Sequence, residues 1–336
     1  MTASNSGFPL FVHAWFRSGS TYIWSKLREN EKLICFYEPF HEVLAEQSLG
    51  AQIEKHKAYE ASSVMRHPVQ DRHYFHEYKE LVEQHQLNFA PDLSYKNYFL
   101  SPDQNDDPRY RHLQTLISYG AAVNRLPVLC FCRSQMRSAW IRKNFAGKHI
   151  AQIRAPLPQW ESFDVLPYFR NTMITVALDL RENCPAYFDH IPNFNRFAAA
   201  FERRKSLPAD QLYEFFLKPD DFLAIFLLVW VLSTLQSVSH SDLALDIDRL
   251  SSDRSYRGFV QEWFAGLGCT VDLSDCSIPK KVSADRQKAS DMLVVAGRAV
   301  KQSPGAMLVW EPTKIAGAFK FMSDESKRAI DLFLNQ

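Results

Sequence analysis

Two kinds of apolar pattern alternate along the first half of the chain. Short runs rich in β-forming residues lie at Pro9–Trp15, Leu33–Tyr37, Pro127–Cys132 and His149–Ile153. Segments with helical spacing, such as Ser134–Phe145, lie between them. Strands that alternate with helices favour a parallel sheet with right-handed crossovers. The pattern therefore predicts an α/β fold with a central, mainly parallel sheet flanked by helices.

The longest apolar stretch of the second half is Phe222–Leu232, which is followed within a few residues by Ser233 and Gln236. It is shorter than the roughly 20 residues that span a bilayer. We therefore expect a buried helix over Phe222–Val238 and no integral membrane segment. Three further elements are predicted: a strand at Leu243, Leu245 and Ile247, a helix at Phe259, Trp263 and Leu267, and a helical part over 283–336 with a break near Pro304 and Gly305.

A helical insertion is predicted at about 51–125. Within it, Asp71–His85 has helical spacing and Ser101–Arg109 is typical of an exposed connection. No internal repeat is visible, and we expect a single domain over 1–336.

The composition is that of a folded globular protein, with 336 residues, 46% hydrophobic and 23% charged. Lys and Arg number 39 against 38 Asp and Glu, so the formal net charge is only +1. A nucleic-acid partner is therefore not expected, and any anion site must be local. No signal peptide precedes residue 9 and no metal-binding spacing joins the cysteines, so we expect a cytoplasmic location and reduced thiols. The six cysteines are Cys35, Cys130, Cys132, Cys184, Cys269 and Cys276.

The loop FRSGST follows the first predicted strand and precedes a helix. Backbone N–H groups, the hydroxyls of Ser20 and Thr21 and the guanidinium of Arg17 could converge there on one phosphate-like anion. The loop has one glycine and no lysine, so it is not a Walker A motif. The alternative is an ordinary helix N-cap by Ser18 or Ser20 after a tight turn at Gly19.

A second candidate lies at the end of the fourth predicted strand, where Arg154-Ala155-Pro156 is followed by Ser162. An arginine at the carboxyl end of a parallel strand lies where ligands of such sheets bind, and a serine about two helical turns later can add a hydroxyl. The alternative is a surface arginine and a solvated serine.

These two features, in this order, resemble the sulfotransferases that use 3′-phosphoadenosine 5′-phosphosulfate. FRSGSTYIW looks like the RSGST loop of the carbohydrate sulfotransferase branch, and Tyr37-Glu38-Pro39 resembles that branch's YEP or FEP segment. DLALDIDRL followed by FVQEWFAGLG resembles a later strand, acidic turn and helix of the family, so the resemblance covers Pro9 to Cys269.

Two departures from the family pattern are visible. Ile247-Asp248-Arg249-Leu250 stands where the family commonly has Tyr-Glu-Asp-Leu. The C-terminal Gly-rich loop with its lysine is absent, and Lys280, Lys281 and Arg286 are its candidate replacements.

The resemblance implies a P-loop-like sulfotransferase fold with helical insertions and transfer of a sulfuryl group to a hydroxyl of a saccharide. The donor would be 3′-phosphoadenosine 5′-phosphosulfate, no metal would be needed, and the partner would be a small-molecule or glycan acceptor. The anion loop, 16–21, would hold the 5′-phosphosulfate and the segment 149–162 the 3′-phosphate. The binding residues would be Arg17, Ser18, Gly19, Ser20, Thr21 and Tyr22 for the former and Arg154 and Ser162 for the latter.

Glu38 is the candidate general base, because it ends the strand that follows the anion loop. Its alternative role is to cap the next turn. His41 is the competing base, since an imidazole titrates near neutral pH. Arg17 would stabilise the transferred group, while Arg133 and Arg137 are expected to be structural or acceptor-binding. His73 and His76 have metal-like spacing without a third ligand and are expected on a solvated helix face.

Two alternative functions stay open at this point. One is a nucleotide-dependent kinase of related topology, against which stands the missing Walker lysine. The other is a non-catalytic nucleotide-binding or interaction protein. Neither the acceptor nor the oligomeric state has a readable signal in the sequence.

Overall fold

The computed structural model describes residues 8–45, 73–84, 86–87, 89–203, 209–278, 284–303 and 310–336. The predicted break near Pro304 and Gly305, the basic pair Lys280 and Lys281, and the first part of the insertion, 51–72, lie outside the described residues.

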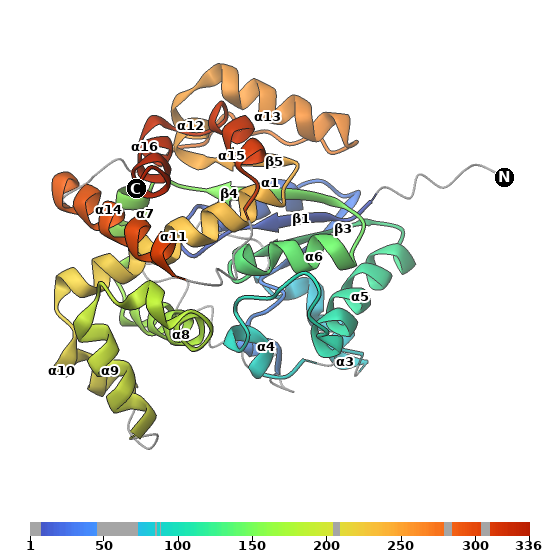
Figure 1. Ribbon diagram of the computed structural model, residues 1–336. Helices are drawn as coiled ribbons and strands as arrows, with labels where there is room; N and C mark the ends of the chain where they lie inside the picture. The colour runs from blue at the N-terminus through green and yellow to red at the C-terminus, as the bar shows by residue number, and fades with distance from the viewer. Residues whose placement is uncertain are drawn as a thin grey trace.

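The centre of the fold is a five-stranded parallel sheet with the order β2-β3-β1-β4-β5 (Figure 1). The predicted α/β class and parallel sheet are confirmed. The strands are β1 (Leu10–His13), β2 (Leu33–Tyr37), β3 (Leu126–Phe131), β4 (Lys148–Ile153) and β5 (Leu243–Asp246).

The strands are apolar on both faces because helices cover both faces of the sheet. β1 is the central strand, and its Val12 lies between Cys130 of β3 and Ile150 of β4. One boundary was predicted wrongly, since Ile247 begins a helix instead of continuing β5. The cause is Asp246, whose carboxylate accepts hydrogen bonds from the next backbone N–H groups and starts that helix.

The predicted buried helix is α11 (Pro219–Ser239), which lies across the strands in the view of Figure 1. It is long and apolar enough to cross a membrane, but it is fully buried inside the fold. It packs against β4 and against α6 (Ser138–Asn144), so it is a core helix of the domain.

The connections hold further helices, several of which the sequence pattern did not predict. Between β1 and β2 lies α1 (Ser20–Arg28). The insertion between β2 and β3 contains η1 (Glu42–Ala45), η2 (His76–Tyr78), α3 (Lys79–Glu83), α4 (Asp92–Tyr95) and α5 (Asp107–Ala122), and η3 (Gln135–Arg137) precedes α6. Between β4 and α11 lie α7 (Pro156–Phe163), α8 (Pro167–Asn183), η4 (Pro185–Phe188), α9 (Pro192–Arg203) and α10 (Ala209–Phe216). The chain ends with α12 (Ile247–Ser252), α13 (Arg254–Gly266), α14 (Arg286–Gln302), α15 (Pro312–Phe319) and α16 (Asp324–Leu334).

The strand order predicts a ligand-binding position at a defined point of the sheet. The connection after β1 leads to one side, toward β2, and the connection after its neighbour β4 leads to the other side, toward β5. Ligands of open parallel sheets bind at the carboxyl ends of two such strands, because the diverging connections leave a crevice there. The loops after β1 and β4 carry the two predicted anion-binding features.

Candidate functional site

The loop after β1 ends at Gly19, which is the N-cap of α1 and has a φ of 83°. A Cβ atom at this position would lie 2.9 Å from Cγ1 of Ile247, so both the backbone conformation and the space require glycine. No side chain caps α1, and its first turn contains no acidic residue. The alternative, a helix N-cap by the side chain of Ser18 or Ser20, is therefore wrong. The first N–H groups of α1 and the positive end of its dipole are left for an anion.

Three side chains from β4 and α7 hold the carbonyl groups of this loop. Gln159 donates to the carbonyl of Phe16 at 2.7 Å, and Gln152 donates to the carbonyl of Ser18 at 2.9 Å. Arg154 donates to the carbonyl of residue 17 between them, at 3.1 Å. The carbonyl oxygens of residues 16, 17 and 18 thus accept hydrogen bonds from buried side chains. These bonds fix the loop and direct the three carbonyl oxygens toward the protein interior.

Arg17 has a φ of 64°, which is unusual for a residue other than glycine or asparagine. Its Nε donates to the backbone oxygen of Ser162 at 3.0 Å and to its hydroxyl at 2.9 Å. Its guanidinium lies 5.3 Å from the ring centre of Phe169. The structure thus brings together Arg17, Arg154 and Ser162, with Ser162 bonded to Arg17.

Arg154 directly precedes Ala155, which lines a cavity of about 530 Å³ together with residues that follow β5. Its Nε lies 3.9 Å from Oδ1 of Asp248, whose Oδ2 accepts the backbone N–H of Ala155 at 2.7 Å. Burial, together with the nearby Asp246, raises the pKa of Asp248 to about 6. Residues lining the cavity include Ala155, Pro158, Arg249, Ser252, Arg286 and Lys320.

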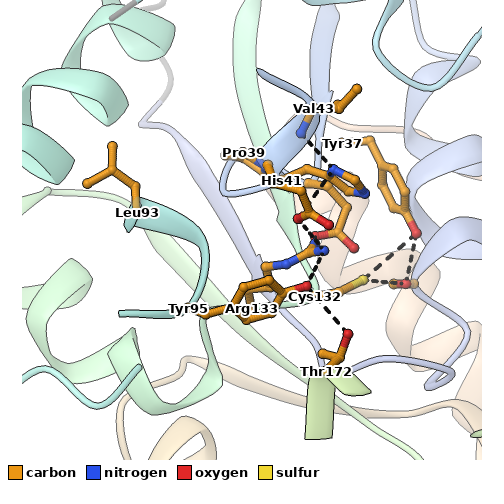
Figure 2. A network of polar contacts seen from close by, with 12 residues as sticks. Tyr37, Pro39, His41, Val43, Leu93, Tyr95, Cys132, Arg133 and Thr172 are labelled. Atoms are coloured by element: carbon orange, nitrogen blue, oxygen red, sulfur yellow. Dashed lines mark hydrogen bonds and ion pairs between the residues drawn. The ribbon is translucent and has the colours of Figure 1, made fainter. Parts of the chain in front are cut away.

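The two hydroxyls of the anion loop point toward the ends of β2 and β3. Ser20 Oγ lies 3.2 Å from the hydroxyl of Tyr37 and 3.0 Å from Sγ of Cys132, and Thr21 Oγ1 lies 2.9 Å from the same tyrosine. Figure 2 shows Tyr37 and Cys132, which also contact each other. Burial raises the pKa of the Cys132 thiol well above its usual value. The hydroxyls therefore tie α1 to the neighbouring strand ends.

The ends of β2 and β3 carry a group that we call the Arg133 cluster, made of Glu38, Glu42, Tyr95, Arg133 and Tyr168. Arg133 Nη1 donates to Glu38 Oε2 at 2.5 Å. Its Nη2 lies 3.0 Å from Glu42 Oε2 and 2.8 Å from the Tyr168 hydroxyl. The same nitrogen lies 3.0 Å from the Tyr95 hydroxyl (Figure 2). The side chains of Arg133 and Glu38 are 1% and 6% exposed, whereas that of Glu42 is 38% exposed.

The formal charge of the Arg133 cluster is −1, because it contains two carboxylates, Glu38 and Glu42, and one guanidinium, Arg133. Burial raises the pKa of Glu42, but Arg133 and His41 lower it by more, so the net shift is downward. Burial lowers the pKa of Arg133, but Glu38, Tyr95, Tyr168 and Glu42 together raise it by more, so the net shift is upward and Arg133 keeps its proton. The sequence did not single out Glu42, Tyr95 or Tyr168, since the tyrosines lie in segments without a motif.

Glu38 is the second residue of the site with an unusual backbone, with a φ of 50°. Among the described residues, four residues other than glycine have positive φ, and two of them are asparagines, which tolerate this conformation. The remaining two are Arg17 and Glu38. Backbone strain of this kind is typical of functional sites.

The other predicted site residues lie around these two groups. The ring of His41 accepts the backbone N–H of Val43 at 3.1 Å, and its Nδ1 lies 3.6 Å from Glu42 Oε2. Tyr22 donates to Asp275 at 2.8 Å on the far side of α1.

Two more expectations are settled by burial. Arg137 is fully buried and donates to backbone carbonyls, including that of Asn97, so it is structural. His73 is buried and precedes η2, so the expected solvated helix face is wrong for this residue. In the part of the chain that the structure describes, no three His, Cys, Asp or Glu side chains are grouped as metal ligands.

Comparison with protein-family models, curated proteins and solved structures finds no match to the chain. The structure itself defines an α/β protein with a five-stranded parallel sheet, in which the loop after β1 contains Arg17 with positive φ.

Proposed function

We propose that the protein is a sulfotransferase that moves a sulfuryl group from 3′-phosphoadenosine 5′-phosphosulfate to a hydroxyl of a saccharide. The observation that most supports this function is that Arg17, Arg154 and Ser162 lie together beside the N-terminus of α1, which no side chain caps. Two guanidiniums at a helix N-terminus suit a ligand with two separate anionic groups.

In this proposal the 5′-phosphosulfate lies against the N–H groups of α1 and the guanidinium of Arg17. The 3′-phosphate lies against Arg154 and the hydroxyl of Ser162. The nucleoside extends into the cavity that begins at Ala155. Arg154 is nine-tenths buried and already faces one carboxylate, Asp248, across 3.9 Å, so it is positioned by the fold before any ligand binds.

The reaction is an in-line displacement. The acceptor oxygen forms a bond to sulfur while the bond from sulfur to the 5′-phosphate oxygen breaks, and adenosine 3′,5′-bisphosphate leaves. Arg17 stabilises the negative charge that develops on the departing phosphate. The acceptor proton passes to a general base, for which the carboxylate of Glu38 is the first candidate and the imidazole of His41 the second. The protein's contribution is mainly alignment and charge stabilisation.

Substitution of Arg17 by Ala tests this assignment. The variant and the natural protein are incubated with the donor and a panel of saccharides, and mass spectrometry detects the gain of one sulfuryl group. We expect turnover to fall by far more than about tenfold, the equivalent of ~1.4 kcal/mol, because Arg17 touches the group being transferred. Arg111→Ala, an exposed arginine on α5, is the control and should retain turnover.

A second outcome separates the alternatives. Binding of the donor without any product would favour a non-catalytic nucleotide-binding protein. Turnover that survives Arg17→Ala would mean that the loop has been assigned wrongly.

A further inference from the structure

The two halves of the crevice carry opposite charge. Arg17 and Arg154 lie at the ends of β1 and β4, whereas the Arg133 cluster, with a formal charge of −1, lies at the ends of β2 and β3. The sheet order β2-β3-β1-β4 sets these halves side by side. A backbone bridge between Trp15 and Arg133 joins the anion loop directly to the end of β3.

The start of α8 connects the halves through two adjacent residues. Phe169 packs 6.0 Å from the ring of Phe16 and lies beneath the guanidinium of Arg17. Its neighbour Tyr168 donates to Glu42 Oε1 at 3.3 Å and contacts Arg133. Glu42 and Arg17 therefore contact adjacent residues of α8, Tyr168 and Phe169.

Arg133 has little capacity left to bind an acceptor. Its side chain is 1% exposed, both terminal nitrogens already contact carboxylates, and the guanidinium lies between the rings of Phe16 and Tyr95, at 4.9 and 5.2 Å. When the donor is bound, Arg17 faces its anionic groups. Among the described residues, an acceptor carboxylate or sulfate would therefore meet Glu42 beside cations that already have anionic partners.

Glu42 is the more exposed carboxylate of the cluster, with its side chain 38% exposed compared with 6% for Glu38. Among the described residues, the charged groups that contact it are Arg133 and His41, and Glu38 contacts Arg133 in turn. An ionised, half-buried carboxylate forms charge-assisted hydrogen bonds that are stronger than neutral ones.

We propose that Glu42 is a specificity-determining residue that selects acceptors with a protonated amine near the hydroxyl to be sulfated and disfavours acidic acceptors. This inference rests on the proposed function. The acceptor class is then an amino sugar or another amine-bearing polyol. An ammonium group restores neutrality to the Arg133 cluster, whereas a carboxylate adds a second uncompensated negative charge.

The test compares three oligosaccharides that differ at one sugar: one with glucosamine, one with N-acetylglucosamine and one with glucuronate. Binding is measured by calorimetry in the presence of adenosine 3′,5′-bisphosphate, and kcat/KM is measured with the donor. For the natural protein we expect the glucosamine acceptor to exceed its N-acetyl counterpart by at least about tenfold in both measurements, and the glucuronate acceptor to be the weakest.

Glu42→Gln keeps the size of the side chain and removes its charge, so the preference for the amine should fall to about twofold or less while the affinity for adenosine 3′,5′-bisphosphate stays unchanged. Tyr168→Phe is the matched control, because it removes one hydrogen bond to Glu42 and leaves the charge. Its preference for the amine should persist.

Three results would overturn the inference: a preference for the acidic acceptor, an unchanged preference in Glu42→Gln, or binding of none of the three. Failure of the proposed function is recognised separately. In that case adenosine 3′,5′-bisphosphate itself does not bind to the natural protein.

Discussion

At the scale of single residues, the site depends on two side chains whose backbone lies in the left-handed region. In this conformation, residue 17 turns its carbonyl toward Arg154 while the side chain of Arg17 reaches Ser162. The backbone N–H of Glu38 donates to the carbonyl of Cys130 at 2.7 Å, which fixes the turn after β2. Each such residue costs of order 1–2 kcal/mol, which the surrounding hydrogen bonds must offset.

The role of Glu38 is tested by Glu38→Gln, which removes basicity and keeps most of the shape. If Glu38 is the base, turnover should fall by ~10² to 10⁴ while donor affinity stays nearly unchanged. Steady-state kinetics and calorimetry together measure both quantities. His41→Asn is the comparison. A dead His41 variant beside an active Glu38 variant would exchange the roles, and two active variants would exclude both residues as the base.

The sequence indicated some site residues and not others for a physical reason. Arg17, Arg154 and Ser162 stand next to strand ends, where motif and topology coincide. Gln152 and Gln159, which hold the loop, are buried amides in an apolar strand and helix, and a polar residue in such a run signals only that it has some partner. The identity of that partner depends on contacts between distant segments.

At the scale of elements, the junction of β1 and α1 is the most constrained part of the fold. Gly19→Ala should destabilise the protein by about 1–3 kcal/mol, because alanine is strained at this φ and its Cβ would press on Ile247. Urea unfolding measures the change. Gly258→Ala is the control, since that glycine lies inside α13 with open space around a Cβ, and it should be neutral or stabilising. Equal destabilisation by both substitutions would contradict this account of the loop.

The strands could be predicted to within two residues at each end, because a strand buried on both faces consists mostly of apolar residues. Helices α8, α9 and α10 escaped prediction, since their apolar residues pack against other helices and no strand or turn signal frames them. Glu42 was missed for a similar reason. Its importance comes from Arg133, which lies in another element.

At the scale of the whole molecule, the strand order brings segments far apart in sequence to one edge of the sheet. The turn after β2 is further fixed by α5, whose His112 contacts the carbonyl of Pro39 through Nε2 at 2.6 Å. Burial lowers the pKa of His112 to about 4 from 6.5.

This histidine links stability to pH. It is neutral in the folded protein and gains a proton more readily when unfolded, so its contribution to stability is lost as the pH falls below 6.5 toward 4. From about pH 7 to about pH 5 the natural protein should lose about 2 kcal/mol more stability than His112→Gln. Denaturant unfolding at the two pH values checks this. The raised pKa of Asp248 has the opposite effect, since it makes the folded protein more stable as the pH falls. Both proteins contain Asp248, so its effect cancels when their losses of stability are compared. Equal losses in the two proteins would show that His112 is not the titrating group.

The central claim is that Arg17, Arg154 and Ser162 form a site for a nucleotide with two separate anionic groups. The most direct measurement is calorimetry of adenosine 3′,5′-bisphosphate and of AMP, which lacks the 3′-phosphate. We predict that the natural protein binds the bisphosphate at least about tenfold more tightly, and that Arg154→Ala removes most of this difference. Equal affinity of the natural protein for the two nucleotides would contradict the account.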